Sequence, residues 1–257
     1  MDTFGKRNEL DIIIDNFNEM AGELGSIETL RTDFISNVSH ELKTPLSIIQ
    51  NYSALMQDER TTDLERKEYS KSIYETSQNL SNLITNILKL NKLENQKIFL
   101  ETSEYNLSEQ LIECLLCFES IWEEKNINID VDIEEDLMLN ADKELTSIIW
   151  NNLYSNAFKF TEDSGEVSIN AKSENNFIIV SISDNGCGMS KDTGKHIFEK
   201  FYQGDTSHAT NGNGLGLALV KRIIDIMNAD IYIESTLGKG TTFTVKLDLN
   251  KNKIYNI

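Results

Sequence analysis

One histidine of this chain has neighbours that suit nucleophilic chemistry. His40 is followed by Glu41, and Thr44 and Pro45 come one helical turn later. On a helix with about 3.6 residues per turn, His40 would face solvent with Thr44 on the same face. Glu41 could accept a hydrogen bond from one ring nitrogen, which leaves the other as the nucleophile. Pro45, the only proline, should bend or loosen the helix at this turn. The apolar stripe expected on the opposite side consists of Phe34, Val38, Leu42, Leu46 and Ile49.

A second group of polar residues is spaced to share one face of a helix. Asn152, Asn156 and Lys159 recur at i, i+4 and i+7. Two amides and a lysine on one face could serve a polyphosphate. Mg²⁺ prefers oxygen ligands, such as an amide carbonyl together with phosphate oxygens. The alternative is an ordinary polar face in contact with solvent, which such a triplet alone does not exclude.

A glycine-rich turn follows an apolar segment at Asp184-Asn-Gly-Cys-Gly-Met189. Gly186 and Gly188 permit a tight turn, and Asp184 at the strand end can accept a hydrogen bond from an exocyclic amine. Taken alone, the motif is also compatible with any turn that ends a strand.

A second glycine-rich stretch, Gly212-Asn-Gly-Leu-Gly-Leu217, runs into a helical segment. Glycine amides followed by a helix N-terminus suit a phosphate. Leu217 stands where a Rossmann fingerprint has its third glycine, and the sequence contains no Walker A motif. The ordinary nucleotide-binding folds are therefore disfavoured.

Composition bounds the class of protein. The 257 residues are enough for two modest domains. The formal net charge of −18 argues against nucleic acid or an anionic membrane surface as a direct partner. Three cysteines are too few for a disulfide framework, which fits a reducing cytoplasm. These residues contain no signal peptide and no apolar run long enough to cross a bilayer.

The first third of the sequence is helical in pattern. Residues 10–24 have apolar positions at coiled-coil spacing, followed by a register shift that is either a built-in discontinuity or an ordinary irregularity. Two longer helices are predicted over 30–57 and 64–93, joined by a polar turn at 58–63. Such a hairpin leaves an apolar stripe that a second copy would bury in a four-helix bundle.

The remainder mixes helices and strands without strict alternation, which favours an α+β layer with helices on one face of a sheet. Helices are predicted over 107–126, 142–160 and 214–227. Strands are predicted over 97–100, 127–133, 166–172, 177–184, 231–234 and 241–249. Residues 185–213 are predicted to be loop-rich. Cys114 and Cys117 are expected to be buried helix cysteines rather than a metal or redox pair.

The segment Phe34-Ile-Ser-Asn-Val-Ser-His-Glu-Leu-Lys-Thr-Pro-Leu46 resembles the H-box of sensor histidine kinases of the commonest dimerisation-domain type. The resemblance implies that His40 accepts a phosphoryl group and that Glu41 acts as general base. It also implies that Thr44 positions water when the kinase dephosphorylates its partner. Residues 17–24 are similar to the end of a HAMP signal-transfer module, so the chain would begin mid-module as the cytoplasmic portion of a membrane sensor.

The order of the later motifs resembles the N, G1 and G2 boxes of the GHKL ATP-binding fold, followed by its last-strand turn, here Gly238-Lys-Gly-Thr-Thr-Phe243. Residues 197–202 look like the kinase F-box. By this match Asn156 would ligate Mg²⁺, and Asn152 and Lys159 would face the phosphates of ATP. Asp184 would hold the adenine amine and Thr241 would line the adenine end. The other residues expected at the nucleotide are Phe160, Gly186, Gly188, Gly212, Gly214, Leu215, Gly216 and Leu217.

The resemblance implies a helical hairpin that dimerises into a four-helix bundle, followed by a GHKL (Bergerat) α/β sandwich. The expected parts are the end of a HAMP module or signalling coiled coil over 1–29, a dimerisation and phosphotransfer domain over 30–94, a catalytic ATP-binding domain over 95–249 and a tail over 250–257. Since the two domains must meet, residues 91–96 should act as a hinge and the lid over 204–211 should be mobile.

One residue departs from the family pattern. Many relatives carry arginine after the F-box Phe-Tyr, close to the γ-phosphate, and Gln203 stands there in this chain. Lys200 or a residue of the lid would then neutralise the charge. Slow autophosphorylation is a consequence to be tested.

The predicted function is ATP-dependent autophosphorylation of His40 in a homodimer, with Mg²⁺, then phosphoryl transfer to an aspartate of a response-regulator receiver domain. Phosphatase activity towards the regulator is expected as well, and its dominance stays open. A scaffolding module with a dead kinase would lack His40, Asn156 or Asp184, all of which are present. A GHKL ATPase of the chaperone or topoisomerase kind would lack the histidine hairpin.

Overall fold

The computed structural model describes residues 9–95, 100–204 and 212–249, without the side chains of 9–16, 18–19, 21–28 and 30–31. The chain divides into two compact units, Met1–Ser81 and Asn82–Ile257. Among the described residues, no helix has the length and apolar character that a membrane span requires. The HAMP resemblance rests mostly on side chains outside the described set.

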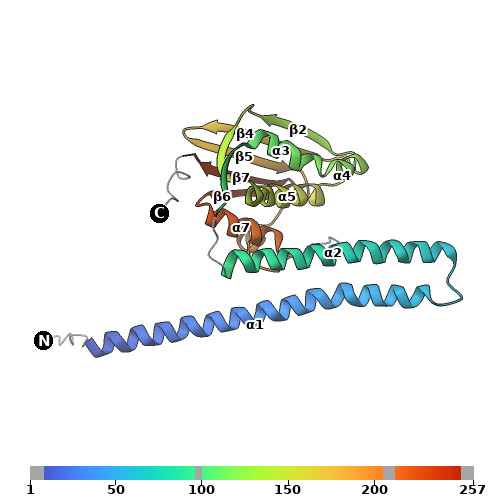
Figure 1. Ribbon diagram of the computed structural model, residues 1–257, viewed down its shortest axis with the longest axis horizontal. Coiled ribbons are helices and arrows are strands. Elements are labelled where there is room, and N and C mark those ends of the chain that lie inside the picture. The colour runs from blue at the N-terminus through green and yellow to red at the C-terminus, as the bar shows by residue number, and fades with distance from the viewer. Residues whose placement is uncertain (1–8, 96–99, 205–211, 250–257) are drawn as a thin grey trace. The chain divides into compact units, whose positions relative to one another are not determined.

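Two long helices begin the chain. Helix α1 spans Glu9–Met56 and α2 spans Asp63–Asn95, and they run antiparallel (Figure 1). We expected a separate helix to begin near residue 30, but α1 is continuous through Gly22, Gly25 and Pro45. An interior glycine costs a helix only about 1 kcal/mol, and a register shift changes the side-chain seam without breaking the backbone.

The turn between α1 and α2 is held by polar contacts, as its composition predicted. Thr62 and Glu65 form a capping box: Thr62 N donates to Glu65 Oε2 at 2.8 Å, and Glu65 N to Thr62 Oγ1 at 3.3 Å. The Arg66 guanidinium donates to the carbonyls of Met56 and Asp58. The first bond satisfies the carbonyl of Met56 at the end of α1, where the last carbonyls of a helix lack partners within it, and the second joins α2 to the turn.

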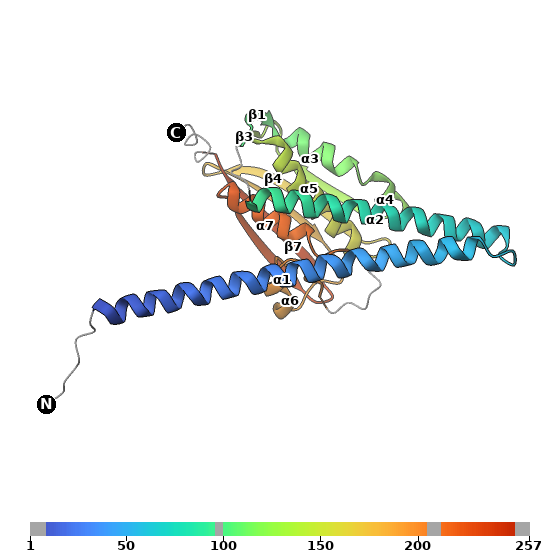
Figure 2. The same cartoon turned by 60° about the horizontal axis from the view of Figure 1, so that its bottom comes forward.

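The second unit contains a five-stranded sheet in the order β2-β4-β5-β7-β6 (Figure 1), and Figure 2 shows this unit from a second side. Its strands are β2 (Asn128–Ile133), β4 (Glu166–Glu174), β5 (Phe177–Asp184), β7 (Gly240–Asp248) and β6 (Asp230–Thr236). The β2–β4 pair is parallel and the other pairs are antiparallel. A separate antiparallel pair joins β1 (Thr102–Asn106) to β3 (Met138–Asp142).

Helices cover one face of this sheet. They are α3 (Leu107–Leu116), α4 (Glu119–Glu124), α5 (Lys143–Phe160) and α7 (Gly216–Ile226), and a short α6 spans Lys191–His196. Alternate strand residues are buried beneath the helices, among them Ile169, Val180, Ile182, Phe243 and Val245. The opposite face is polar: Ser181 and Thr244 hydroxyls lie 3.0 Å apart, and those of Ser183 and Thr242 lie 2.8 Å apart. The two-layer α+β prediction is thus confirmed.

Several predictions of local structure were wrong or incomplete. The segment 107–126 forms two helices rather than one, because Phe118 leaves the helical conformation and stacks on Phe158 at 5.5 Å. Cys114 is buried, but Cys117 at this break is exposed. Strand β3 and helix α6 were not predicted. Strand β1 at 102–106 was not predicted either, and the strand predicted over 97–100 falls mostly on residues 96–99, which lie outside the description, as do the lid residues 205–211 and the tail 250–257.

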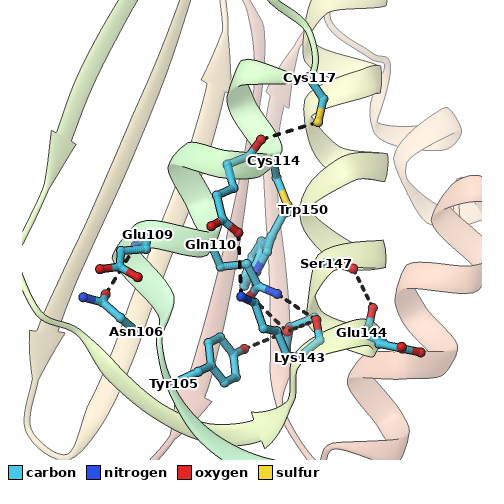
Figure 3. Close-up of polar contacts among 12 residues, drawn as sticks. Tyr105, Asn106, Glu109, Gln110, Cys114, Cys117, Lys143, Glu144, Ser147 and Trp150 are labelled. Atoms are coloured by element: carbon cyan, nitrogen blue, oxygen red, sulfur yellow. Dashed lines mark hydrogen bonds and ion pairs between the residues drawn. The ribbon is translucent and has the colours of Figure 1, made fainter.

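A buried polar network fixes α5 against α3 (Figure 3). Gln110 on α3 donates to the carbonyl of Lys143 at 2.7 Å and accepts from Thr146 Oγ1 at 3.0 Å and from Trp150 Nε1 at 3.2 Å. The Tyr105 hydroxyl lies 2.7 Å from Thr146 Oγ1, and burial raises the pKa of Tyr105 to about 12. Because each buried polar atom has a partner, the network specifies one rotational setting of α5.

Lys125 caps the other end of α5. Its Nζ donates to the carbonyls of Phe158 and Thr161, each at 2.8 Å. A cation at a helix C-terminus satisfies free carbonyls and complements the helix dipole. This one contact therefore ties the segment after α4 to the end of the helix that carries Asn152, Asn156 and Lys159.

Replacing this cap should destabilise the second unit. We expect Lys125→Met to lower the free energy of unfolding by about 2 kcal/mol, because two carbonyls lose a charged donor. Tryptophan fluorescence during urea unfolding measures this, since both tryptophans, Trp122 and Trp150, lie in that unit. The control is Lys239→Met, at an exposed lysine in the β6–β7 turn. Equal urea midpoints for the two variants would contradict the role of the cap.

Candidate functional site

His40 is exposed on α1, as its helical position predicted. Its side chain keeps 80% of its accessible surface, and its Nδ1 lies 3.8 Å from Glu41 Oε1. Thr44 Oγ1 donates to the His40 carbonyl at 3.3 Å, and Ser39 Oγ donates to the Ile35 carbonyl at 2.8 Å. The imidazole is thus open to an incoming group, with the carboxylate on its Nδ1 side.

The polar face of α5 meets the second glycine-rich stretch. Asn152 Nδ2 donates to the Ile148 carbonyl at 2.8 Å, while Asn152 Oδ1 lies against Gly216, where a Cβ would come within 2.5 Å of it. Lys159 Nζ likewise lies against Gly212. The structure therefore brings together two regions that are separated by more than fifty residues, and the absence of a Cβ at Gly212 and Gly216 lets these side-chain ends approach the backbone.

Asn156 lies between these two contacts along α5 and is half-buried. Within the described structure no hydrogen bond occupies its side chain, so its amide oxygen is available. Lys159 follows three residues later with its Nζ also 4.6 Å from the centre of the Phe160 ring. Burial lowers the pKa of Lys159, which a neighbouring anion would reverse. An oxygen donor beside a partly desolvated lysine suits a phosphate with its counter-cation.

The N-terminus of α7 completes this face. Its N-cap, Leu215, offers no side-chain hydrogen bond to the first turn. Gly214 precedes it with φ +63° and packs against the backbone of Phe201, whose N–H donates to the Gly214 carbonyl at 2.9 Å. The backbone N–H groups at the start of the helix are thus left for an anion.

The turn after β5 is packed backbone to backbone. A Cβ on Gly186 would overlap the Phe160 carbonyl, and one on Gly188, which has φ +61°, would overlap the Thr236 carbonyl. Across the turn, a Cβ on Gly240 would overlap the Asp184 carbonyl. The turn is therefore held between the end of α5 and the β6–β7 hairpin, with no space for a side chain at Gly186 or Gly188.

This packing determines the position and the surroundings of the Asp184 side chain. Its Oδ1 accepts from the Gly186 N–H at 3.0 Å, and its carboxylate also accepts from the Thr241 N–H. Burial nevertheless raises the pKa of Asp184 above its ordinary value. A half-buried carboxylate with remaining acceptor capacity is suited to a donor such as an exocyclic amine.

Two contacts near the F-box were not foreseen. Lys200 Nζ forms an ion pair with Glu94 at 2.7 Å, so the structure does not place it as an unpaired cation for the γ-phosphate. Gln203 Nε2 donates to the Gly212 carbonyl at 2.7 Å. No local pattern signals either contact, because both join residues that only the fold brings together. In the described ranges, no group of three or more His, Cys, Asp or Glu could hold a metal ion.

Comparison with known proteins agrees with these two sets of residues. The family model described as "His Kinase A (phospho-acceptor) domain" matches residues 30–96. The model described as "Histidine kinase-, DNA gyrase B-, and HSP90-like ATPase" matches residues 141–251. The chain belongs to the histidine kinases.

Relatives support this assignment. The heme sensor protein HssS of Staphylococcus saprophyticus subsp. saprophyticus is 33% identical over 241 residues, which are 93% of this histidine kinase chain and 51% of HssS. The chain thus spans about half the length of that relative. The structure of full-length ShkA with AMPPNP is 27% identical, with a TM-score of 0.63, covering 86% of this chain and 45% of ShkA. The structure of histidine kinase ThkA in complex with the response regulator TrrA is 23% identical, with a TM-score of 0.73. The match covers 93% of this chain and 67% of ThkA and shows that the two share a fold.

The electrostatics of Asp184 lead to a stability prediction for this kinase chain. Because burial raises its pKa, the ionised carboxylate is less favourable in the folded state than in the unfolded state. Asp184→Asn should therefore stabilise the ligand-free second unit at pH 7. The gain should vanish as the pH falls below 3.8, where both states carry the protonated acid. Urea unfolding followed by tryptophan fluorescence at several pH values measures this. Asp163→Asn, at an exposed carboxylate, is the control, and a loss of stability in Asp184→Asn at pH 7 would contradict the argument.

Proposed function

We propose that this chain uses Mg-ATP to phosphorylate His40 and then transfers the phosphoryl group to an aspartate of a response-regulator receiver domain. The observation that carries the proposal is the convergence of Asn152 and Lys159 on the glycine stretch 212–216, in a chain whose H-box histidine is exposed. The first feature suits a polyphosphate, and the second supplies its acceptor.

In the nucleotide site, Asp184 accepts a hydrogen bond from the adenine amine, and Thr241 lines that end of the site. Asn152, Lys159 and the N–H groups of Gly216 and Leu217, at the start of α7, face the phosphates. Asn156 would hold Mg²⁺ through its free amide oxygen, and the ion would neutralise charge on the phosphates when bound. Phe160 and the turn at Gly186 and Gly188 shape the pocket between these two ends.

The phosphoryl transfer is an in-line displacement. The unprotonated Nε2 of His40 attacks the γ-phosphorus, the bond from this phosphorus to the bridging oxygen breaks, and ADP leaves with the bond's electron pair. Glu41 lies on the Nδ1 side at 3.8 Å, so a small side-chain rotation would let it accept a hydrogen bond and stabilise the positive charge that develops on the ring. As general base, Glu41 can then remove the Nδ1 proton. Positioning and electrostatic stabilisation supply most of the rate.

Dimerisation is part of the proposal. Apolar side chains remain exposed along the hairpin, including Ile35, Leu46, Leu55 and Tyr74. A second copy of the hairpin would cover them in a four-helix bundle. We also propose the division into a HAMP end (1–29), a phosphotransfer domain (30–94) and an ATP-binding domain (95–249), with attachment to the membrane through an upstream segment and a cytoplasmic location. The receiver partner is supported by ThkA, which was solved with a response regulator.

Thr44 is proposed to orient water during dephosphorylation of the regulator. Its hydroxyl lies on the same helical face as His40 and uses its proton on the His40 carbonyl, which leaves oxygen lone pairs free to accept from a water. This places the kinase and phosphatase functions on one helical turn.

Labelling with γ-³²P Mg-ATP tests the central step. We expect an acid-labile, base-stable label on the intact chain, because a phosphoramidate bond to histidine has that stability. The label should be absent from His40→Gln, which lacks the nucleophile, and from Asn156→Ala, which lacks the proposed Mg²⁺ ligand. His196→Gln is the control, since His196 pairs with Glu199 within the second unit, and it should still be labelled. A label that survives His40→Gln would refute the proposal.

Gln203 offers a gain-of-function test. Its amide contacts the Gly212 carbonyl, beside Lys159, so position 203 borders the proposed phosphate site. We expect Gln203→Arg to raise the initial labelling rate about tenfold, because a cation there would stabilise charge on the transferred group. Gln203→Met, of similar size and without charge, should not raise it. An unchanged rate in Gln203→Arg would show that position 203 does not limit catalysis.

A further inference from the structure

Three polar side chains stand in one row across neighbouring strands of the sheet. Asp184 on β5 is the register partner of Thr241 on β7, and Thr241 is the register partner of Ser235 on β6. Residues in register on adjacent strands point to the same face. Thr241 is buried, with 7% of its surface exposed, so its hydroxyl must find partners within the site.

Ser235 is the centre of this arrangement. Its Oγ accepts from the Met189 N–H at 2.8 Å, donates to the Gly240 carbonyl at 3.0 Å and lies 2.9 Å from Thr241 Oγ1. It therefore connects the turn after β5, which ends at Met189, with the start of β7. Neither the function proposed above nor the family motifs assign it a role.

Counting protons determines the direction of the third contact. A serine hydroxyl has one proton to donate and two lone pairs. The Gly240 carbonyl can only accept, so it takes the Ser235 proton, and the Met189 N–H takes one lone pair. The contact to Thr241 must then use the second lone pair, with Thr241 as the donor. The Thr241 proton is thereby committed to Ser235, and only oxygen lone pairs of Thr241 remain for a ligand.

We propose that Ser235 is a positioning residue that makes the base site selective for a 6-aminopurine, by holding the Thr241 hydroxyl as an acceptor beside Asp184. A 6-amino group can donate to both the carboxylate and the hydroxyl. A 6-oxo group is itself an acceptor, so it could not donate to the carboxylate or to the hydroxyl. Both would be left unpaired, which is costly in a partly buried site. This inference rests on the proposed binding of ATP at Asp184.

The test compares ATP with purine riboside triphosphate, which lacks the 6-amino group, in calorimetric titrations of the full chain. In Ser235→Ala the Thr241 hydroxyl is free to rotate, so we expect the preference for ATP over the analogue to fall about fivefold. Ser235→Thr, which restores a hydroxyl on a strand residue, should keep the preference. A purely structural defect would weaken both nucleotides by the same factor and would overturn the proposal.

A double-mutant cycle makes the test specific to the Ser235–Thr241 pair. Thr241→Val removes the hydroxyl and should lower the preference by itself, after which Ser235→Ala should cause no further decrease. Should Ser235→Ala fail to fold, Thr241→Val still decides, because an unchanged preference there overturns the inference. If the unaltered chain binds neither nucleotide, the proposed function fails as well. If ATP binds normally and no variant changes the preference for ATP over the analogue, the role of Ser235 is overturned and the proposed function stands.

Discussion

The nucleotide site depends on the close approach of three backbone segments around Gly186, Gly188 and Gly240. At each position a Cβ would overlap a carbonyl of another segment: the end of α5, the β6–β7 hairpin or the end of β5. This packing places Asp184 next to Thr241 and Phe160 next to the turn. The site is therefore built from main-chain contacts, and side chains supply its chemistry only at its edges.

Helix α5 joins that packed region to the phosphate side. Its inner face carries Trp150, Tyr154 and Phe158, which are fully buried, and the Gln110 network prevents it from rotating. Lys125 holds its C-terminal end. With these constraints on the inner face, the outer face is directed at the glycine stretch that precedes α7. Apolar packing and buried hydrogen bonds on the far side of the same helix thus hold Asn152 and Lys159 in well-defined positions.

The helical hairpin follows a different principle. Its turn is determined by local polar contacts, whereas its long apolar stripe remains partly exposed in a single chain. Burial of that stripe by a second copy and exposure of His40 are compatible, because Ile35 and Leu46 lie well away from His40 around α1. The ATP-binding unit, by contrast, has its own buried core between sheet and helices.

Local periodicity and motif order were enough to predict much of this protein. Helical spacing placed His40 on the exposed side of α1 and Asn152, Asn156 and Lys159 on one face of α5. Alternating apolar residues predicted four strands of the main sheet well, since a buried face requires them. The break at Phe118, strand β3 and helix α6 were missed, because each depends on a partner distant in the sequence or is too short to show a period.

Tertiary structure alone decided which polar groups meet. The contacts of Gln203 with Gly212, Lys200 with Glu94 and Ser235 with Thr241 join separate segments and depend on strand register and helix packing. No spacing along the chain encodes them. The sequence by itself determined which residues could do chemistry and on which face of each element they lie. The folded structure determined the partners, because a hydrogen bond requires positions accurate to a fraction of an ångström.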